Sequence, residues 1–228
     1  IAENIAVRGS YTLPGDSYPV AVTDQANLEI TVYDLAGGAL EEDAVIKRFP
    51  AFSSVGYEAA GMRFREWQGR RVMLAVGRYH AEMVDWESGE LLWQYTGDLI
   101  WNAHAVELLP NGVIAVAGST GNSLAFFDST DGDNKNPVRL EMTDAHGVVW
   151  DPDQALLWAC GGNRLRAFSV ELTNGTIAVN EQTSRAVTLP ETGAHDLQPI
   201  YGRQGLYWVS TAKSLLIFNS VTGEVSAA

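Results

Sequence analysis

The sequence repeats a short motif, and the spacing of its copies constrains the fold more than any other feature. A histidine stands where a polar stretch becomes an apolar run in WNAHAVEL, DAHGVVW and TGAHDLQP, at His104, His146 and His195. The second histidine lies 42 residues after the first, and the third lies 49 residues after the second. Self-similarity with a period of about 20 to 50 residues is typical of solenoids and propellers. We therefore expect a repeat protein.

An earlier copy of the motif lacks the histidine. The stretch YEAAGMRF aligns with WNAHAVEL, so that Tyr57 matches Trp101, Glu58 matches Asn102 and Ala60 matches His104. Before this copy the chain holds the runs VAVTD (20–24) and LEITVYDL (28–35), but no inner run in the same frame. This difference predicts either closure by strands from both chain ends or a sixth repeat beyond Ala228.

Apolar and polar residues alternate with a period of two in many short runs, which is typical of strands. Turn-forming clusters such as STGNS, DGDNKNP and GGN separate the runs. Units of about 45 residues with three or four antiparallel strands favour propeller blades. We therefore expect an all-β fold in which residues 1–228 form one β-propeller domain, with five blades, or six if a C-terminal strand or blade is missing; a β-sandwich is the alternative.

Composition excludes some classes of function. The chain has 15 Lys and Arg against 28 Asp and Glu, and a net charge of −13 opposes binding to nucleic acid or to anionic membranes. No run approaches the roughly 18 apolar residues of a membrane span. Cys160 is the only cysteine, so no disulfide forms within the chain, and we expect a packed thiol. The first residue is Ile1 rather than Met, which favours a trimmed, secreted or extracellular protein, and we expect a monomer.

The repeated histidines should meet at one end of the propeller. The loop that enters each inner strand shares a face with the loop between the second and third strands, because antiparallel strands alternate in direction. We therefore expect His104, His146 and His195 around one mouth of the central channel, with His80 on the same side. The residues expected to bind a ligand there are Glu58, Arg78, Tyr79, His80, Trp101, Asn102, Asp144 and Asp196.

Three interpretations of this cluster stay open. In the first, each imidazole bonds a neighbouring backbone and stabilises the rim of the channel. In the second, His104, His146 and His195 are ligands of a divalent metal such as Zn, Mn or Ca, with an open position for a substrate oxygen. In the third, the same three histidines are catalytic without a metal: one is a general acid or base and the others bind a ligand together with Arg78.

Three long segments carry a resemblance to a known family. They are HAVELLPNGVIAVAGSTGNSLAFFD (104–128), AHGVVWDPDQALLWACGGNRLRAF (145–168) and AHDLQPIYGRQGLYWVST (194–211), with VTDQAN (22–27) before them. The chain resembles an uncharacterised family of mostly secreted bacterial proteins with quinoprotein-dehydrogenase-like propeller repeats. The resemblance implies a propeller fold and export. We nevertheless expect no quinone cofactor, because the tryptophan docking repeat of quinoprotein enzymes is not evident in the sequence.

The histidine cluster also resembles, in architecture alone, the axial site of oligogalacturonate lyase, where histidines hold a metal or serve β-elimination. Fold analogy is a weak basis for function. Five arginines of the second repeat form either a basic patch at the mouth or a charged outer strand: Arg63, Arg65, Arg70, Arg71 and Arg78. We expect a secreted propeller that binds a carbohydrate, and in one version cleaves it by β-elimination as a lyase or by hydrolysis; a non-catalytic protein-interaction or structural module is the alternative.

Overall fold

The computed structural model describes residues 18–38, 40–49 and 58–228, and this part of the chain is all-β. It folds into five antiparallel sheets of three to five strands, here called sheets A to E in chain order. Within each sheet, strands that follow one another in the sequence pair with one another. The expected all-β class is confirmed. In the described residues no helix is long and apolar enough to cross a membrane.

The first two sheets hold seven strands. Sheet A comprises β1 (Pro19–Asp24), β2 (Glu29–Asp34) and β3 (Val45–Phe49), and sheet B comprises β4 (Gly61–Trp67), β5 (Arg70–Gly77), β6 (His80–Asp85) and β7 (Leu91–Thr96).

The other three sheets follow the same pattern. Sheet C comprises β8 (Ala103–Leu108), β9 (Val113–Gly118), β10 (Ser123–Asp128) and β11 (Val138–Glu141). Sheet D comprises β12 (Ala145–Asp151), β13 (Leu156–Gly161), β14 (Arg164–Thr173) and β15 (Thr176–Glu181), and the short strand β16 (Val187–Thr188) pairs with β14. Sheet E comprises β17 (Asp196–Pro199), β18 (Leu206–Ser210), β19 (Leu215–Asn219) and β20 (Val225–Ala227). Short 3-10 turns lie between strands as η2 (Leu35–Gly37), η3 (Glu42–Ala44), η4 (Asp98–Ile100) and η5 (Thr183–Arg185).

The sheets pack face to face on their neighbours in the chain. Strand β5 shows why: its residues from Val72 to Val76 are all buried, although successive side chains point to opposite faces. Met73 and Ala75 belong to a core shared with sheet A, whereas Val72, Leu74 and Val76 belong to a core shared with sheet C. Further cores join sheet C to sheet D and sheet D to sheet E.

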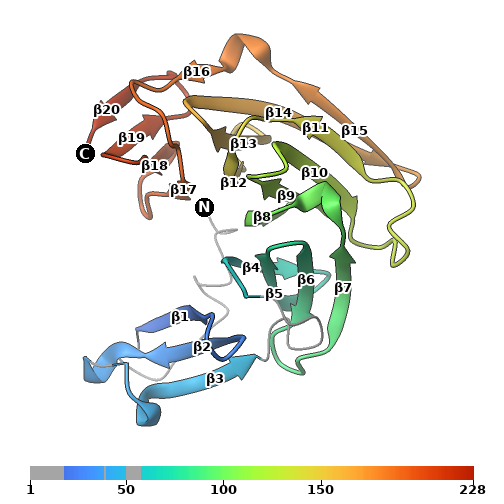
Figure 1. Ribbon diagram of the computed structural model, residues 1–228, viewed down its shortest axis with the longest axis vertical. Coiled ribbons are helices and arrows are strands. Elements are labelled where there is room, and N and C mark those ends of the chain that lie inside the picture. Colours follow the sequence, from blue (N-terminus) through green and yellow to red (C-terminus); the bar gives the residue numbers. More distant parts are fainter. Residues whose placement is uncertain (1–17, 39, 50–57) are drawn as a thin grey trace.

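Figure 1 shows the five sheets following one another along an arc, with sheets A and E at its two ends. The first strands of sheets B to E, which are β4, β8, β12 and β17, lie toward the inside of the arc. Strands β4, β8 and β12 each contact the first strand of the following sheet. Sheet A has three strands, and in the described residues no strand pairs with β1 on its inner side, as the missing inner run in the sequence predicted.

Two glycines let the inner strands approach one another closely. A Cβ on Gly61 of β4 would lie 2.3 Å from the carbonyl oxygen of His104 on β8. A Cβ on Gly147 of β12 would lie 2.8 Å from the backbone nitrogen of Leu197 on β17. The backbone spacing at this end of the inner strands therefore requires residues without side chains.

Candidate functional site

Two of the repeated histidines occupy β-bulges at the start of their inner strands. In sheet C, Ala103 pairs with Gly118 and Ala105 pairs with Ala117, so that His104 is the extra residue. In sheet D the pairs Ala145 with Gly161 and Gly147 with Cys160 leave His146 as the extra residue. A bulge leaves one residue out of the ladder and turns its side chain in a new direction. Local backbone geometry therefore sets both imidazoles apart from the packed faces of their sheets.

The structure brings the three repeated imidazoles together in a row. The ring centroids of His104 and His146 lie 4.5 Å apart with an interplanar angle of 43°, and those of His146 and His195 lie 4.5 Å apart at 63°. His104 lies on β8 and His146 on β12, and His195 directly precedes β17; Figure 1 places these three strands toward the inside of the arc. We call these three residues the histidine row.

The hydrogen-bond partners of His146, the middle ring, decide which of its nitrogens carries the hydrogen. His146 is 7% exposed, and its Nδ1 lies 3.0 Å from the carbonyl oxygen of Asp144 and 3.2 Å from Oδ1 of the same residue. Both oxygens can only accept a hydrogen bond, so Nδ1 must carry the hydrogen. In the neutral ring Nε2 then holds a lone pair, which accepts a hydrogen bond.

The two outer rings are more accessible. His195 is exposed and His104 is half-buried, and in the described part of the chain neither ring makes a hydrogen bond. Burial, and then the neighbouring rings of His146 and His195, lower the pKa of His104, while Asp144 acts in the opposite direction. The lowered pKa favours the neutral form of His104 at neutral pH, and among the described residues its ring nitrogens make no hydrogen bond.

An aromatic pair lies near the start of β8, at the same end of sheet C as His104. The ring of Tyr79 stacks on Trp101 at 6.1 Å between centroids and 18° between planes, and Trp101 is 45% exposed. Tyr79 belongs to the β5–β6 turn, which is tied to the entry of β8 because the backbone nitrogen of Ala103 donates to the carbonyl oxygen of Arg78 at 3.0 Å. The hydrogen bond places this turn at the end of sheet C where His104 lies.

The remaining predicted ligand-binding residues have protein partners. Glu58 Oε2 lies 4.0 Å from Arg78 Nη1, with both side chains about half exposed. Asn102 has a positive φ of 57°, and its amide donates to the hydroxyls of Ser119 at 2.9 Å and Thr120 at 3.1 Å. Asn102 therefore fixes the turn between β9 and β10.

His80 does not join the row. Its ring is fully buried in sheet B, where Nε2 lies 3.3 Å from Glu82 Oε2 and Nδ1 lies 2.7 Å from Thr96 Oγ1. The carboxylate accepts from Nε2, and the hydroxyl donates to Nδ1. The expectation that His80 binds a ligand at the mouth is not supported, because a fully buried ring with both nitrogens engaged stabilises its own sheet.

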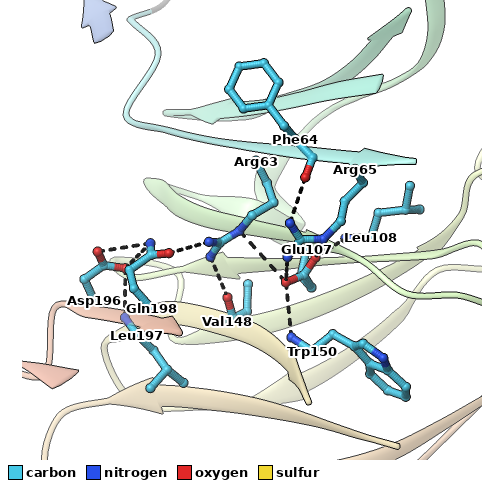
Figure 2. A network of polar contacts seen from close by, with 10 residues as sticks. All are labelled: Arg63, Phe64, Arg65, Glu107, Leu108, Val148, Trp150, Asp196, Leu197 and Gln198. Carbon is cyan, nitrogen blue, oxygen red and sulfur yellow. Dashed lines mark hydrogen bonds and ion pairs between the residues drawn. The ribbon is translucent and has the colours of Figure 1, made fainter. Parts of the chain in front are cut away.

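A second polar layer lies further along the same inner strands (Figure 2). The Glu107 carboxylate is fully buried and accepts hydrogen bonds from Arg65 Nε at 2.8 Å and from Arg65 Nη2 at 2.5 Å. It also accepts from the backbone nitrogens of Leu108 at 2.9 Å and Trp150 at 3.1 Å. The layer therefore joins β4, β8 and β12 by charge-assisted hydrogen bonds.

Arg63 extends this layer to sheet E. Its side chain is 10% exposed, Nη2 donates to the carbonyl oxygen of Val148 at 3.1 Å, and Nη1 donates to Oε1 of Gln198. Gln198 in turn donates through Nε2 to both carboxylate oxygens of Asp196, at 3.0 and 3.2 Å. Burial, opposed by Glu107, lowers the pKa of Arg63.

The prediction of a charged outer strand is wrong for two of the five arginines. Arg63 and Arg65 lie on β4, the innermost strand of sheet B, and they are buried. Arg70 pairs with Glu90, and Arg71 pairs with Glu87. The sequence held a signal for the buried pair, because Arg63 and Arg65 share one parity of the run GMRFREW and so face the same side of a strand.

Two further expectations concern metal and thiol chemistry. Among the described residues, no group of three or more His, Cys, Asp and Glu side chains is arranged to hold a metal ion. The three imidazoles pack beside one another, and the metal interpretation gains no support from this geometry.

Cys160 is fully buried, and burial raises the pKa of its thiol to about 12, so it is an inert core residue as expected.

Comparison with known families adds one finding. Residues 71–226 match the model of a family described as "Family of unknown function (DUF6528)". The chain belongs to this family. The region that matches DUF6528 runs from β5 to β20 and includes all three members of the histidine row. No curated protein matches the chain. An uncharacterised family was expected, and the DUF6528 description assigns it no activity.

Proposed function

We propose that this DUF6528 domain is a secreted β-propeller that binds a carbohydrate at a mouth formed by His104, His146 and His195. One observation carries the proposal: three imidazoles from successive sheets lie 4.5 Å apart in a row, and the outer two have ring nitrogens without a hydrogen bond in the described residues. Burying a row of polar rings without partners is costly, so a site that keeps them accessible is suited to a ligand that supplies the partners.

The sheet arrangement supports a propeller. Successive sheets pack face to face, their first strands contact one another, and turns of one sheet bond the entry of the next. In sheet D, for example, the carbonyl oxygen of Gly162 accepts from the backbone nitrogen of Ala194, which precedes β17. Five sheets in this order correspond to five blades of a propeller that repeats once per sheet.

The chemistry of the row suits hydroxyl groups. A neutral imidazole offers one acceptor and one donor, and a sugar hydroxyl can satisfy either. The exposed face of Trp101, backed by Tyr79, offers an aromatic surface of the kind on which the apolar face of a sugar ring packs. Together these groups supply the mixed polar and aromatic contacts that a small-molecule site requires.

Cleavage is the less supported part of the proposal. Asp144 and His146 have the geometry of a base held by an orienting carboxylate, with 3.2 Å between Oδ1 and Nδ1. A β-elimination on a uronate also requires a cation to neutralise the sugar carboxylate. The expected cation, Arg78, lies 4.0 Å from Glu58. Binding without turnover is therefore the function that the geometry favours.

A glycan array tests the proposal directly. The wild-type protein should bind at least one carbohydrate class, and the triple variant His104→Ala, His146→Ala, His195→Ala should lose that binding. Lys135→Ala is the matched control, because Lys135 pairs with Asp133 in the β10–β11 loop, at the other end of sheet C from His104. If circular dichroism shows that the triple variant is misfolded, the single variant His195→Gln replaces it, since His195 is exposed. Binding that survives these changes would contradict the proposal.

A protein-interaction module is the second candidate. The exposed aromatic pair Tyr79 and Trp101 favours it, because aromatic residues are enriched at the centre of protein interfaces. The substitution Trp101→Ala separates the two functions. It should weaken glycan binding only partly if the histidine row supplies the main contacts, and it should abolish a protein contact that is centred on the indole.

A further inference from the structure

The charge nearest to the histidine row is negative. The carboxylate of Asp144 lies 3.2 Å from His146 Nδ1 and is about half exposed. Asp196 directly follows His195, but its carboxylate accepts hydrogen bonds from Gln198 Nε2 and from the backbone nitrogen of Leu197. Glu58 and Arg78 face one another at 4.0 Å, so their charges offset each other toward a ligand. A ligand at the row therefore meets the carboxylate of Asp144 at short range.

The nearest buried cation is already committed to protein groups. The Arg63 guanidinium donates to Gln198, and Gln198 donates to Asp196. A guanidinium can only donate and a carboxylate can only accept, so the amide of Gln198 has one possible orientation. This relay of hydrogen bonds links Arg63 to Asp196. Arg65 is likewise committed, to the Glu107 carboxylate.

Exposed cations at this end act only weakly on the row. Lys213, in the β18–β19 turn, is exposed, and an exposed lysine is screened by solvent and salt. The charged or titratable groups that perturb His104 are His146, His195 and Asp144, and no lysine or arginine is among them. The charged group that acts on the row at short range is therefore the carboxylate of Asp144.

We propose that the histidine row selects amino sugars and neutral sugars and rejects uronic acids. This inference rests on the proposed carbohydrate-binding function and names its substrate class. A protonated sugar amine pairs with Asp144, and a neutral sugar bonds the imidazoles through its hydroxyls. The carboxylate of a uronate meets the like charge of Asp144, while Arg63 and Arg65 are committed to protein groups, and this repulsion disfavours binding.

Titration calorimetry with three tetrasaccharides at neutral pH tests the selectivity. The probes are tetramers of glucosamine, N-acetylglucosamine and galacturonic acid, and the imidazole signals of the row are followed by NMR in parallel. We expect the glucosamine tetramer to bind at least about tenfold tighter than the galacturonate tetramer, the size of effect that one close charge pair produces. Asp144→Asn should reduce the preference for glucosamine over N-acetylglucosamine several-fold. Asp144→Gly, which suits the positive φ of 50° at this position, should act in the same direction and serves if the first variant does not fold.

Asp133→Asn is the matched control, since this carboxylate lies in the β10–β11 loop and pairs with Lys135. It should leave the order of the three probes unchanged. Tighter binding of the galacturonate tetramer would overturn the selectivity and leave the carbohydrate-binding function standing. If none of the three probes binds or shifts the imidazole signals, both proposals are overturned. Glucosamine binding that is equally weakened by Asp133→Asn would also overturn the inference, because it would reflect only the overall charge of −13.

Discussion

Two polar layers lie along the inner strands, and they differ in how fully their hydrogen-bonding groups are used. In the second polar layer, formed by Arg63, Arg65, Glu107 and Gln198 and here called the lower layer, the Glu107 carboxylate is fully buried. It accepts four hydrogen bonds, two from Arg65 and two from backbone nitrogens. In the histidine row only His146 has a bonded ring nitrogen among the described residues. Among the described residues Arg63 Nε is buried without a hydrogen-bond partner, but the Glu107 carboxylate is fully bonded. A buried network of this kind fixes a structure, whereas accessible groups without partners are available to a ligand. The comparison assigns stability to the lower layer and binding to the row.

The largest expected effect is the loss of stability on removing the Glu107 carboxylate from the lower layer. Glu107→Ala leaves the guanidinium of Arg65 buried without its partner, and removal of one member of a buried ion pair typically costs about 3 to 5 kcal/mol. We expect a loss of stability of this size in urea unfolding. Glu181→Ala is the control, because the Arg166–Glu181 pair is more exposed and should contribute about 1 kcal/mol or less. Equal losses in the two variants would remove the distinction between the layers.

The close approach of the inner strands gives the next effect. Gly61→Ala places a Cβ 2.3 Å from the carbonyl oxygen of His104, so the backbone of β4 or β8 must shift. Overpacking of this kind typically costs about 1 to 3 kcal/mol. Gly132→Ala is the control, because nothing lies within 4 Å of its added Cβ. Thermal unfolding of both variants measures the difference, and a neutral Gly61→Ala would show that the strands are not held together at this point.

Two histidines that the sequence predicted on the same side of the propeller should respond differently. His80→Ala removes a fully buried ring that bonds Glu82 and Thr96, and the unsatisfied groups should cost about 2 to 3 kcal/mol. His195→Ala removes an exposed ring and should change stability by less than about 1 kcal/mol while weakening glycan binding. Denaturant unfolding and the glycan array read out the two effects. The comparison fails if His195→Ala is the more destabilising change.

The smallest effect is a pH dependence of stability. The pKa of His104 is lowered below 6.5 in the folded state by burial and by the adjacent rings, so the unfolded chain binds its proton at higher pH. The contribution of His104 is therefore fully present above pH 6.5 and is lost as the pH falls below it. Urea unfolding between about pH 7 and pH 5 should show this loss in the wild type. His104→Gln should make the curve shallower over that range, and an unchanged curve would contradict the assignment.

The sequence predicted the strands and the meeting of the three histidines, because equivalent positions in successive repeats fold to equivalent positions in space. The bulges that hold His104 and His146 were not predictable, since one extra residue in a strand leaves no mark on an alternating pattern this short. His80 was misplaced for a different reason. It lies in the expected turn region, but its side chain faces Thr96 on the next strand, and only the pairing of β6 with β7 decides that direction.

The lower polar layer was missed because its members come from four strands. Arg63, Glu107, Trp150 and Gln198 are separated by 35 or more residues in the sequence, and no local pattern marks them as partners. Glu107 illustrates the difficulty, since a glutamate in an apolar run ordinarily indicates the solvent side of a strand. Its burial depends on an arginine supplied by the preceding sheet.

Each hydrophobic core lies between two neighbouring sheets, and this arrangement affects which sheets unfold locally. In the described residues each cluster holds one sheet against the next, with no cluster shared by sheets A and E. Local unfolding of sheet C breaks its cores with sheets B and D, whereas local unfolding of sheet E breaks only its core with sheet D among the described residues. In a chain of nearest-neighbour contacts, amide protons exchange fastest at the ends and slowest in the middle. Among the described residues sheet E packs on sheet D alone, so His195 should leave and rejoin the row more often than His104, and the site should assemble by the arrival of this ring.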